Sequence, residues 1–195
     1  MVRLSPRFLI ATVSAFIGLG ATPQDSAPGS LIENFRATVS QHCKAARDTW
    51  AVPLIQHCGY LAHYDERSRL SAWPVPRARS AEELGAIGGT LQVLYEQPIE
   101  GDLFLMYQPR QQRFVHAGIV TAVLARGRYS RLSPYVDIAS IEGDTDHQGR
   151  MGGGMAMQMT RRLSHASGDR FFRWTELATH HQQMARTALL SRRSA

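Results

Sequence analysis

Three stretches decide the fold: Gly101-Asp102-Leu103-Phe104-Leu105, Phe114-Val115-His116-Ala117-Gly118-Ile119-Val120 and Ile141-Glu142-Gly143-Asp144-Thr145. The first is a turn that leads into a strand. The second is a strand that carries a histidine among apolar residues, and the third is a strand that ends in carboxylates. Residues 117–124 are apolar on both faces, which predicts a strand in the centre of a sheet. A histidine on one strand and a carboxylate on the next can hold a general base and its orienting partner.

The pattern around these stretches predicts an α+β protein, with helices first and an antiparallel sheet after them. Helices are expected over 31–47, over 52–63 and from the capping box at 80–83 to Gly88-Gly89, with a last one from Thr175 to about Leu190. Strands are expected at 91–96, 103–107, 114–124, 135–142, 153–160 and 170–174, separated by turns that include one at Gly127.

The N-terminus has the order of a secretory signal. Arg3 and Arg7 precede an apolar stretch over 8–19, and small and then polar residues follow. The apolar stretch is too short to span a bilayer, and its other interpretation is a surface helix. We therefore expect residues 1–29 to be a signal-like segment and linker, 30–175 the domain, and 176–195 a helix and tail. The expected location is periplasmic or extracellular, or cytoplasmic if the segment is not a signal.

The net charge of +6 comes almost wholly from arginine, since Lys44 is the only lysine. No basic run is longer than two residues, which argues against a dedicated nucleic-acid interface. A diffuse positive field still favours anionic partners, including nucleic acid, membrane surfaces and anionic cell-wall polymers.

The sequence predicts no metal or cofactor site. Cys43 and Cys58 allow one disulfide at most and form no CxxC pair. Asp144 begins a stretch like a calcium loop, but the twelfth position is Met155 instead of the glutamate that such loops need. The glycines over 149–154 lack the lysine of a phosphate-binding loop.

Taken together with Arg170-Phe171-Phe172-Arg173-Trp174, the three opening stretches resemble the CHAP domain over roughly residues 45 to 175. CHAP domains are cysteine- and histidine-dependent amidohydrolases and peptidases of the papain-like superfamily, and they cut peptidoglycan. The resemblance implies a papain-like fold with a partly barrel-like sheet of about six strands. It also implies that peptidoglycan or its stem peptides are the partner.

The same resemblance implies roles for individual residues. His116 would be the general base, Glu142 its orienting group, and Trp50 and Asp144 would line the binding site. Asp144 stands where the family often has asparagine, so its charge would raise the pKa of the imidazole. A turn residue is the other interpretation of Asp144.

The nucleophile is the exception. The family pattern is Trp-Cys-x-x-Phe-Val-x-x-Cys, and here Trp50 and Cys58 match while the nucleophile position is Ala51. A methyl group cannot attack a carbonyl. Cys58 follows seven residues later, on the same side of a helix but about 10 Å further along its axis. It is either an unconventional nucleophile or a buried core cysteine, and Cys43 could be its disulfide partner in an exported protein.

Three functions follow from these observations. The first is a degenerate CHAP-like protein whose cleft binds wall peptide or a partner without turnover. The second is an active amidase or endopeptidase that uses Cys58 with His116. The third is an unrelated α+β binding module. The CHAP-like hypotheses predict that His116 lies close to residue 51 and within reach of Glu142.

Overall fold

The computed structural model describes residues 6–18, 51–63, 78–130, 133–152 and 154–176. The helices are α1 (Pro6–Ser14), α3 (Ala51–His63) and α4 (Ala81–Thr90). The strands are β1 (Leu94–Tyr95), β2 (Leu103–Gln108), β3 (Arg113–Ser130), β4 (Ser133–Thr145), β5 (Met155–Leu163) and β6 (Arg170–Phe172), with short 3₁₀ turns η2 (His165–Ser167) and η3 (Trp174–Glu176). The helices expected over 31–47 and up to Leu190, together with Trp50, Cys43 and Lys44, lie outside the described residues.

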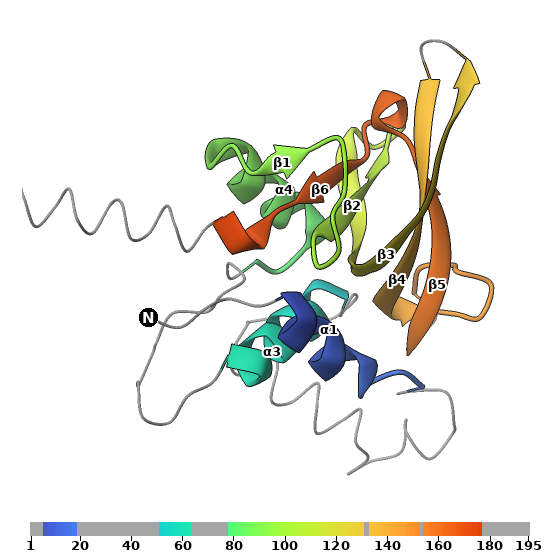
Figure 1. Ribbon diagram of the computed structural model, residues 1–195. Helices are drawn as coiled ribbons and strands as arrows, with labels where there is room; N and C mark the ends of the chain where they lie inside the picture. The colour runs from blue at the N-terminus through green and yellow to red at the C-terminus, as the bar shows by residue number, and fades with distance from the viewer. Residues whose placement is uncertain (1–5, 19–50, 64–77, 131–132, 153, 177–195) are drawn as a thin grey trace, which may run out of the picture.

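The chain is an α+β protein, as the sequence predicts, with a six-stranded sheet in the order β1-β6-β2-β3-β4-β5. Every pair of neighbouring strands is antiparallel. The resemblance implied a partly barrel-like sheet, but the sheet does not close into a barrel, because β1 and β5 each pair on one side only. Figure 1 shows the strongly twisted sheet, with α1 and α3 side by side at one end of it and α4 close to β1 and β6.

The predicted turn at Gly127 is wrong. β3 runs through Gly127 to Ser130, and β3 and β4 extend beyond the other strands as a two-stranded ribbon (Figure 1). Gly127 pairs with Tyr135, and a Cβ at Gly127 would lie 2.4 Å from the Tyr135 hydroxyl. The glycine therefore makes room for a ring across the strand pair and does not mark a turn.

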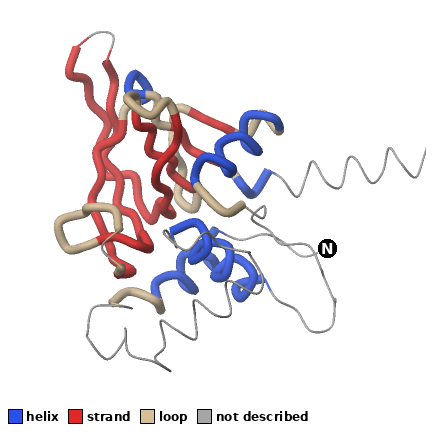
Figure 2. The backbone as a smooth tube through the Cα atoms, turned by 180° about the vertical axis from the view of Figure 1, so that it is seen from behind, coloured by secondary structure: helices blue, strands red, loops and turns tan. Residues whose placement is uncertain are grey.

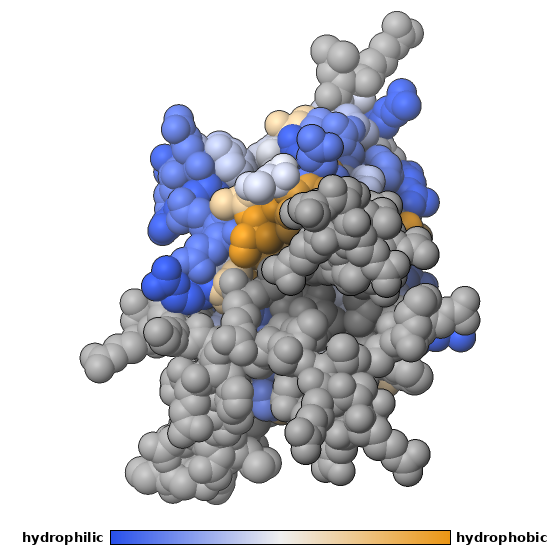
Figure 3. All heavy atoms as spheres, turned by 90° about the vertical axis from the view of Figure 1, so that its left-hand side faces the viewer, coloured by the Kyte–Doolittle hydropathy of each residue, from blue (hydrophilic) through white to orange (hydrophobic). Residues whose placement is uncertain are grey.

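Alternation along the strands gives the sheet two different faces. One face packs with the helices in a large apolar cluster that includes Leu103, Ala117 and Ile119. The opposite face carries a smaller cluster of Phe104, Val120, Val136, Ile138, Leu163 and Phe171. Figure 2 shows from behind that α1 and α3 lie together at one end of the sheet. On another side of the molecule, an apolar area lies between hydrophilic residues (Figure 3).

Helix α4 begins where the capping box predicts. The Ser80 side chain accepts a hydrogen bond from the Glu83 N–H at 3.2 Å. The Glu83 carboxylate accepts from the Arg79 N–H at 2.7 Å, one residue before the cap. The first interaction satisfies an N–H group that the first turn would leave without a partner, and the second ties Glu83 to the residue before the cap.

Helix α1 lies within the segment with the order of a secretory signal, and it packs against α3. Leu9 and Val13 are fully buried in the large apolar cluster. Gly101, at φ +87°, approaches Pro6 so closely that a Cβ would lie 2.1 Å from the proline Cβ. After the helix, the Gly18 N–H donates to the Ala156 carbonyl at 2.8 Å. Residues 6–18 are thus built into the same core as the rest of the described chain.

The first and last motif stretches form a structural clamp. The Arg173 guanidinium donates to both carboxylate oxygens of Asp102, at 3.3 and 3.1 Å, and lies over the Tyr95 ring at 4.0 Å. The Trp174 indole N–H donates to the Gly101 carbonyl at 2.6 Å. These bonds join segments about seventy residues apart, so the Gly-Asp and Arg-Trp pairs fix the fold near the sheet edge.

Candidate functional site

The histidine and the carboxylate of the central motifs meet on the face of the smaller apolar cluster. His116 lies on β3 and Glu142 on β4, and His116 Nε2 lies 2.8 Å from Glu142 Oε2. Glu142 is completely buried, and His116 is 4% exposed. Because Nε2 faces the carboxylate, the ring orientation is fixed and Nδ1 is the nitrogen left for another group. The contact between the two residues is therefore present, while their catalytic roles stay predictions. The other predicted contact is not supported, because the His116 ring lies against Phe104 of the smaller cluster, whereas α3 packs in the large cluster on the opposite face of the sheet. His116 therefore does not face residue 51.

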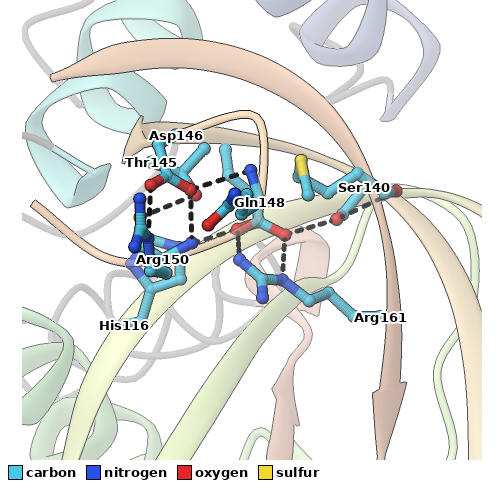
Figure 4. Close-up of polar contacts among 9 residues, drawn as sticks. His116, Ser140, Thr145, Asp146, Gln148, Arg150 and Arg161 are labelled. Carbon is cyan, nitrogen blue, oxygen red and sulfur yellow. Dashed lines mark hydrogen bonds and ion pairs between the residues drawn. The ribbon is translucent and has the colours of Figure 1, made fainter. Parts of the chain in front are cut away.

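Glu142 has two further partners that we did not predict from the sequence. Arg161 of β5 donates through Nε to Oε1 at 2.8 Å and through a terminal nitrogen to Oε2 at 2.5 Å, and the Ser140 hydroxyl donates to Oε1 at 2.7 Å. Figure 4 shows His116, Ser140 and Arg161 converging from three strands. We call Glu142, His116, Arg161 and Ser140 the carboxylate network.

The carboxylate network keeps Glu142 ionised despite its burial. Burial alone raises the pKa of this carboxyl, but the hydrogen bonds and charges of Arg161 and His116 outweigh it and lower the pKa from 4.5 to about 2. The same contacts favour the charged form of Arg161, because its hydrogen bonds to Glu142 raise the pKa of the guanidinium. The ion pair is bidentate, and only 15% of the Arg161 side chain is exposed.

Gly118 explains why the motif reads histidine-any residue-glycine. It lies two residues after His116 on the same face of β3 and pairs with Phe104 of β2. A Cβ at Gly118 would lie 2.5 Å from the Phe104 ring, 2.8 Å from Glu142 Cγ and 2.9 Å from the Ile141 carbonyl oxygen. Because Gly118 has no side chain, the Glu142 side chain can occupy this space and reach His116.

The loop after β4 is ordered by its own polar contacts. Asp144 has φ +59°, a left-handed conformation that aspartate and asparagine adopt more readily than most residues. The Asp146 carboxylate accepts from the N–H groups of Gln148 and Arg150 and from the Arg150 side chain, and these contacts lower its pKa to about 2. The labelled residues of this loop lie beside the carboxylate network (Figure 4). Asp144 therefore has a conformational reason for its place, and its predicted effect on the imidazole stays a prediction.

The two candidate nucleophile positions lie on α3. Ala51 is the first residue of the helix and is 4% exposed. Cys58 is a free thiol with no exposed surface, and burial raises its pKa well above the usual range. The thiolate is the attacking species of cysteine hydrolases, so the environment of Cys58 opposes the ionisation that catalysis needs.

Chemically, the arrangement can orient an imidazole, because the Glu142 carboxylate contacts Nε2. Among the described residues, the first turn of α3 carries no thiol or hydroxyl side chain. Within the described ranges, no three His, Cys, Asp or Glu side chains gather closely enough to hold a metal ion.

The sequence could have indicated Arg161, although we did not predict it. β5 carries Arg161 on the same face as buried Leu163, and an arginine at a half-buried strand position requires a charged partner. Ser140 gives a similar but weaker signal, as a fully buried hydroxyl on the face of Glu142.

In the part of the chain that the structure describes, no helix is both long enough and apolar enough to cross a membrane. Comparison of the sequence with protein-family models and with curated proteins, and of the structure with solved structures, found no match.

Proposed function

We propose that this protein is a degenerate, non-catalytic relative of the CHAP hydrolases that binds peptidoglycan stem peptides or a protein partner. One observation carries the proposal. The carboxylate network around His116 and Glu142 is complete, whereas the residue at the start of α3, where the family resemblance places the nucleophile, is Ala51. An orienting pair without a nucleophile fits a binding function better than turnover.

An active enzyme would have to use Cys58, and the properties of that thiol do not favour this. Cys58 lies seven residues into α3, about 10 Å along the axis from the helix start. Its side chain is fully buried, and its raised pKa keeps it protonated at neutral pH. A base must approach the proton that it removes to about 3 Å.

The proposed partners follow from charge and from the resemblance. The chain carries a net charge of +6, which favours association with anionic wall polymers and would be weakened by salt. Export to the periplasm or the cell exterior is part of the proposal, since peptidoglycan lies there.

A peptidoglycan assay with three proteins tests the proposal: the native chain, Cys58→Ser and Ala51→Cys. Each is tested for release of soluble fragments from purified sacculi and for co-sedimentation with them. We expect the native chain and Cys58→Ser to sediment with the sacculi without releasing fragments. Ala51→Cys should bind equally well, and any gain of hydrolysis should occur in this variant alone.

Other outcomes would select the alternative functions. Hydrolysis by the native chain that is lost in Cys58→Ser would establish an active enzyme and overturn the proposal. Failure of all three proteins to bind or cleave sacculi would favour the unrelated binding module. Sedimentation is repeated at high salt, because binding by diffuse charge alone would be lost there.

A further inference from the structure

Three methionines follow one another along β5 in alternation: Met155, Met157 and Met159. Alternate residues of a strand share a face, so the three side chains point the same way. We call them the methionine track. All three are partly exposed, and none belongs to either apolar cluster of the described residues. β5 is moreover an edge strand. The track is therefore not explained as core packing.

The track lies on the same face as the carboxylate network. Arg161 continues the alternation of the track, and its side chain reaches Glu142. In the β4–β5 register Met157 is opposite Glu142 and Met159 is opposite Ser140. The loop after β4 approaches this face, since a Cβ at Gly149 would lie 3.0 Å from the Met159 methyl carbon.

The chemistry of these side chains is specific. A thioether is a soft, polarisable, neutral donor that suits Cu(I), whereas carboxylate and water ligands suit Mg²⁺ and Ca²⁺. Positive charge nearby would oppose a bound cation, but the guanidinium on the same strand face, Arg161, is neutralised by Glu142 in a bidentate ion pair. We propose that the methionine track binds one soft monovalent cation of the Cu(I) class. This proposal is independent of the function proposed above.

Strand geometry limits which sulfur atoms can share an ion. Residues two apart on a strand are separated by about 7 Å, and residues four apart by about 13 Å. Two flexible methionine side chains can bring their sulfur atoms onto one ion across the shorter separation but not across the longer one. Met155 and Met159 therefore cannot share an ion, and Met157 belongs to both feasible pairs. Met157 is the essential ligand, and its two neighbours are alternatives to each other.

Ag(I) is the probe for the test, because it is a soft monovalent ion that needs no reductant. The full chain carries Cys43→Ser and Cys58→Ala, which remove the thiols that would otherwise bind silver. Titration calorimetry and native mass spectrometry give the affinity and the stoichiometry. We expect one Ag(I) per chain, and no binding of Mg²⁺ to the track.

Methionine-to-leucine variants separate the thioether from its volume, because this exchange is nearly isosteric. Met157→Leu should weaken Ag(I) binding by about tenfold or more, and each of Met155→Leu and Met159→Leu by less. The triple variant should lose the site. Met106→Leu is the matched control, since Met106 packs against the smaller apolar cluster, and it should bind like the parent.

Thermal unfolding of each variant confirms that it is folded before it is titrated. Equal affinity of the parent and the triple leucine variant would overturn the proposal, as would a parent that binds no Ag(I). If Met157→Leu weakened binding less than its neighbours do, the assignment of Met157 as the shared ligand would be wrong.

Discussion

Replacing Gly118 by alanine tests whether the histidine-any residue-glycine motif is a packing requirement of the carboxylate network. The new methyl group would lie 2.5 Å from the Phe104 ring, 2.8 Å from Glu142 Cγ and 2.9 Å from the Ile141 carbonyl oxygen. Two of these neighbours cannot move freely, because the carbonyl belongs to the β3–β4 pair and Glu142 is held by three side chains. Overpacking of this kind destabilises a protein by about 1–3 kcal/mol.

An opposing effect is smaller. Alanine loses less backbone entropy than glycine on folding, which would stabilise the variant by about 0.5–1 kcal/mol. The steric effect should therefore dominate at Gly118. For a chain of this length each kcal/mol lowers the melting temperature by about 2–4 °C, so we expect a fall of several degrees in thermal unfolding followed by circular dichroism.

Gly89→Ala is the matched control for this measurement. Gly89 is exposed on α4, and a Cβ there would meet no atom within 4 Å. The same exchange should raise stability by up to about 1 kcal/mol, because alanine is the better helix former. The two variants thus have expected effects of opposite sign. A Gly118→Ala protein that melts at or above the temperature of the parent would refute the packing argument.

Three further predictions concern the network and the N-terminal helix. The pKa of Glu142 is lowered from 4.5 to about 2 in the folded state, so ionised Glu142 stabilises the fold fully above pH 4.5, and this stabilisation is lost as the pH falls towards 2. The difference in unfolding free energy between the parent and Glu142→Gln, measured in urea, should therefore shrink over that range. Arg161→Lys should destabilise the protein by at least about 1 kcal/mol, because lysine cannot form the bidentate pair with Glu142. The control, Arg162→Lys, lies in a half-exposed pair with Asp137 and should change stability by less than about 1 kcal/mol; equal effects in urea unfolding would contradict this. Leu9→Ala should cost about 2–5 kcal/mol because Leu9 is fully buried, and Ile17→Ala, at 44% exposure, should have little effect; a Leu9 variant as stable as the parent would show that α1 does not belong to the core.

Local patterns predicted much of this fold. Strand-like runs separated by turn residues located the six strands, and the capping box located Ser80 at the start of α4. Both signals depend on neighbours in sequence, so they survive without knowledge of tertiary structure. The same patterns placed His116 and Glu142 on neighbouring strands, where they are in contact.

Features that depend on distant parts of the chain were not predictable in this way. Gly127 has the composition of a turn, but its role is set by Tyr135 across the ribbon. Asp102 and Arg173 are 71 residues apart, and no local rule pairs them. Arg161 is opposite Ile138, and Glu142 is opposite Met157, so Arg161 reaches Glu142 diagonally and pairing of directly opposite residues does not give the contact.

The position of helix α1 in the sequence determines when its contacts can form during synthesis. The helix is synthesised well before the residues that receive it, which include Gly101 and Ala156. At a usual elongation rate of 5–20 residues per second, the interval between Gly18 and Ala156 is roughly 7 to 28 s. During that interval the apolar side of α1 has no completed acceptor surface and is open to any factor that binds nascent apolar helices. The contacts of α1 with the core can therefore be completed only after Ala156 has been synthesised.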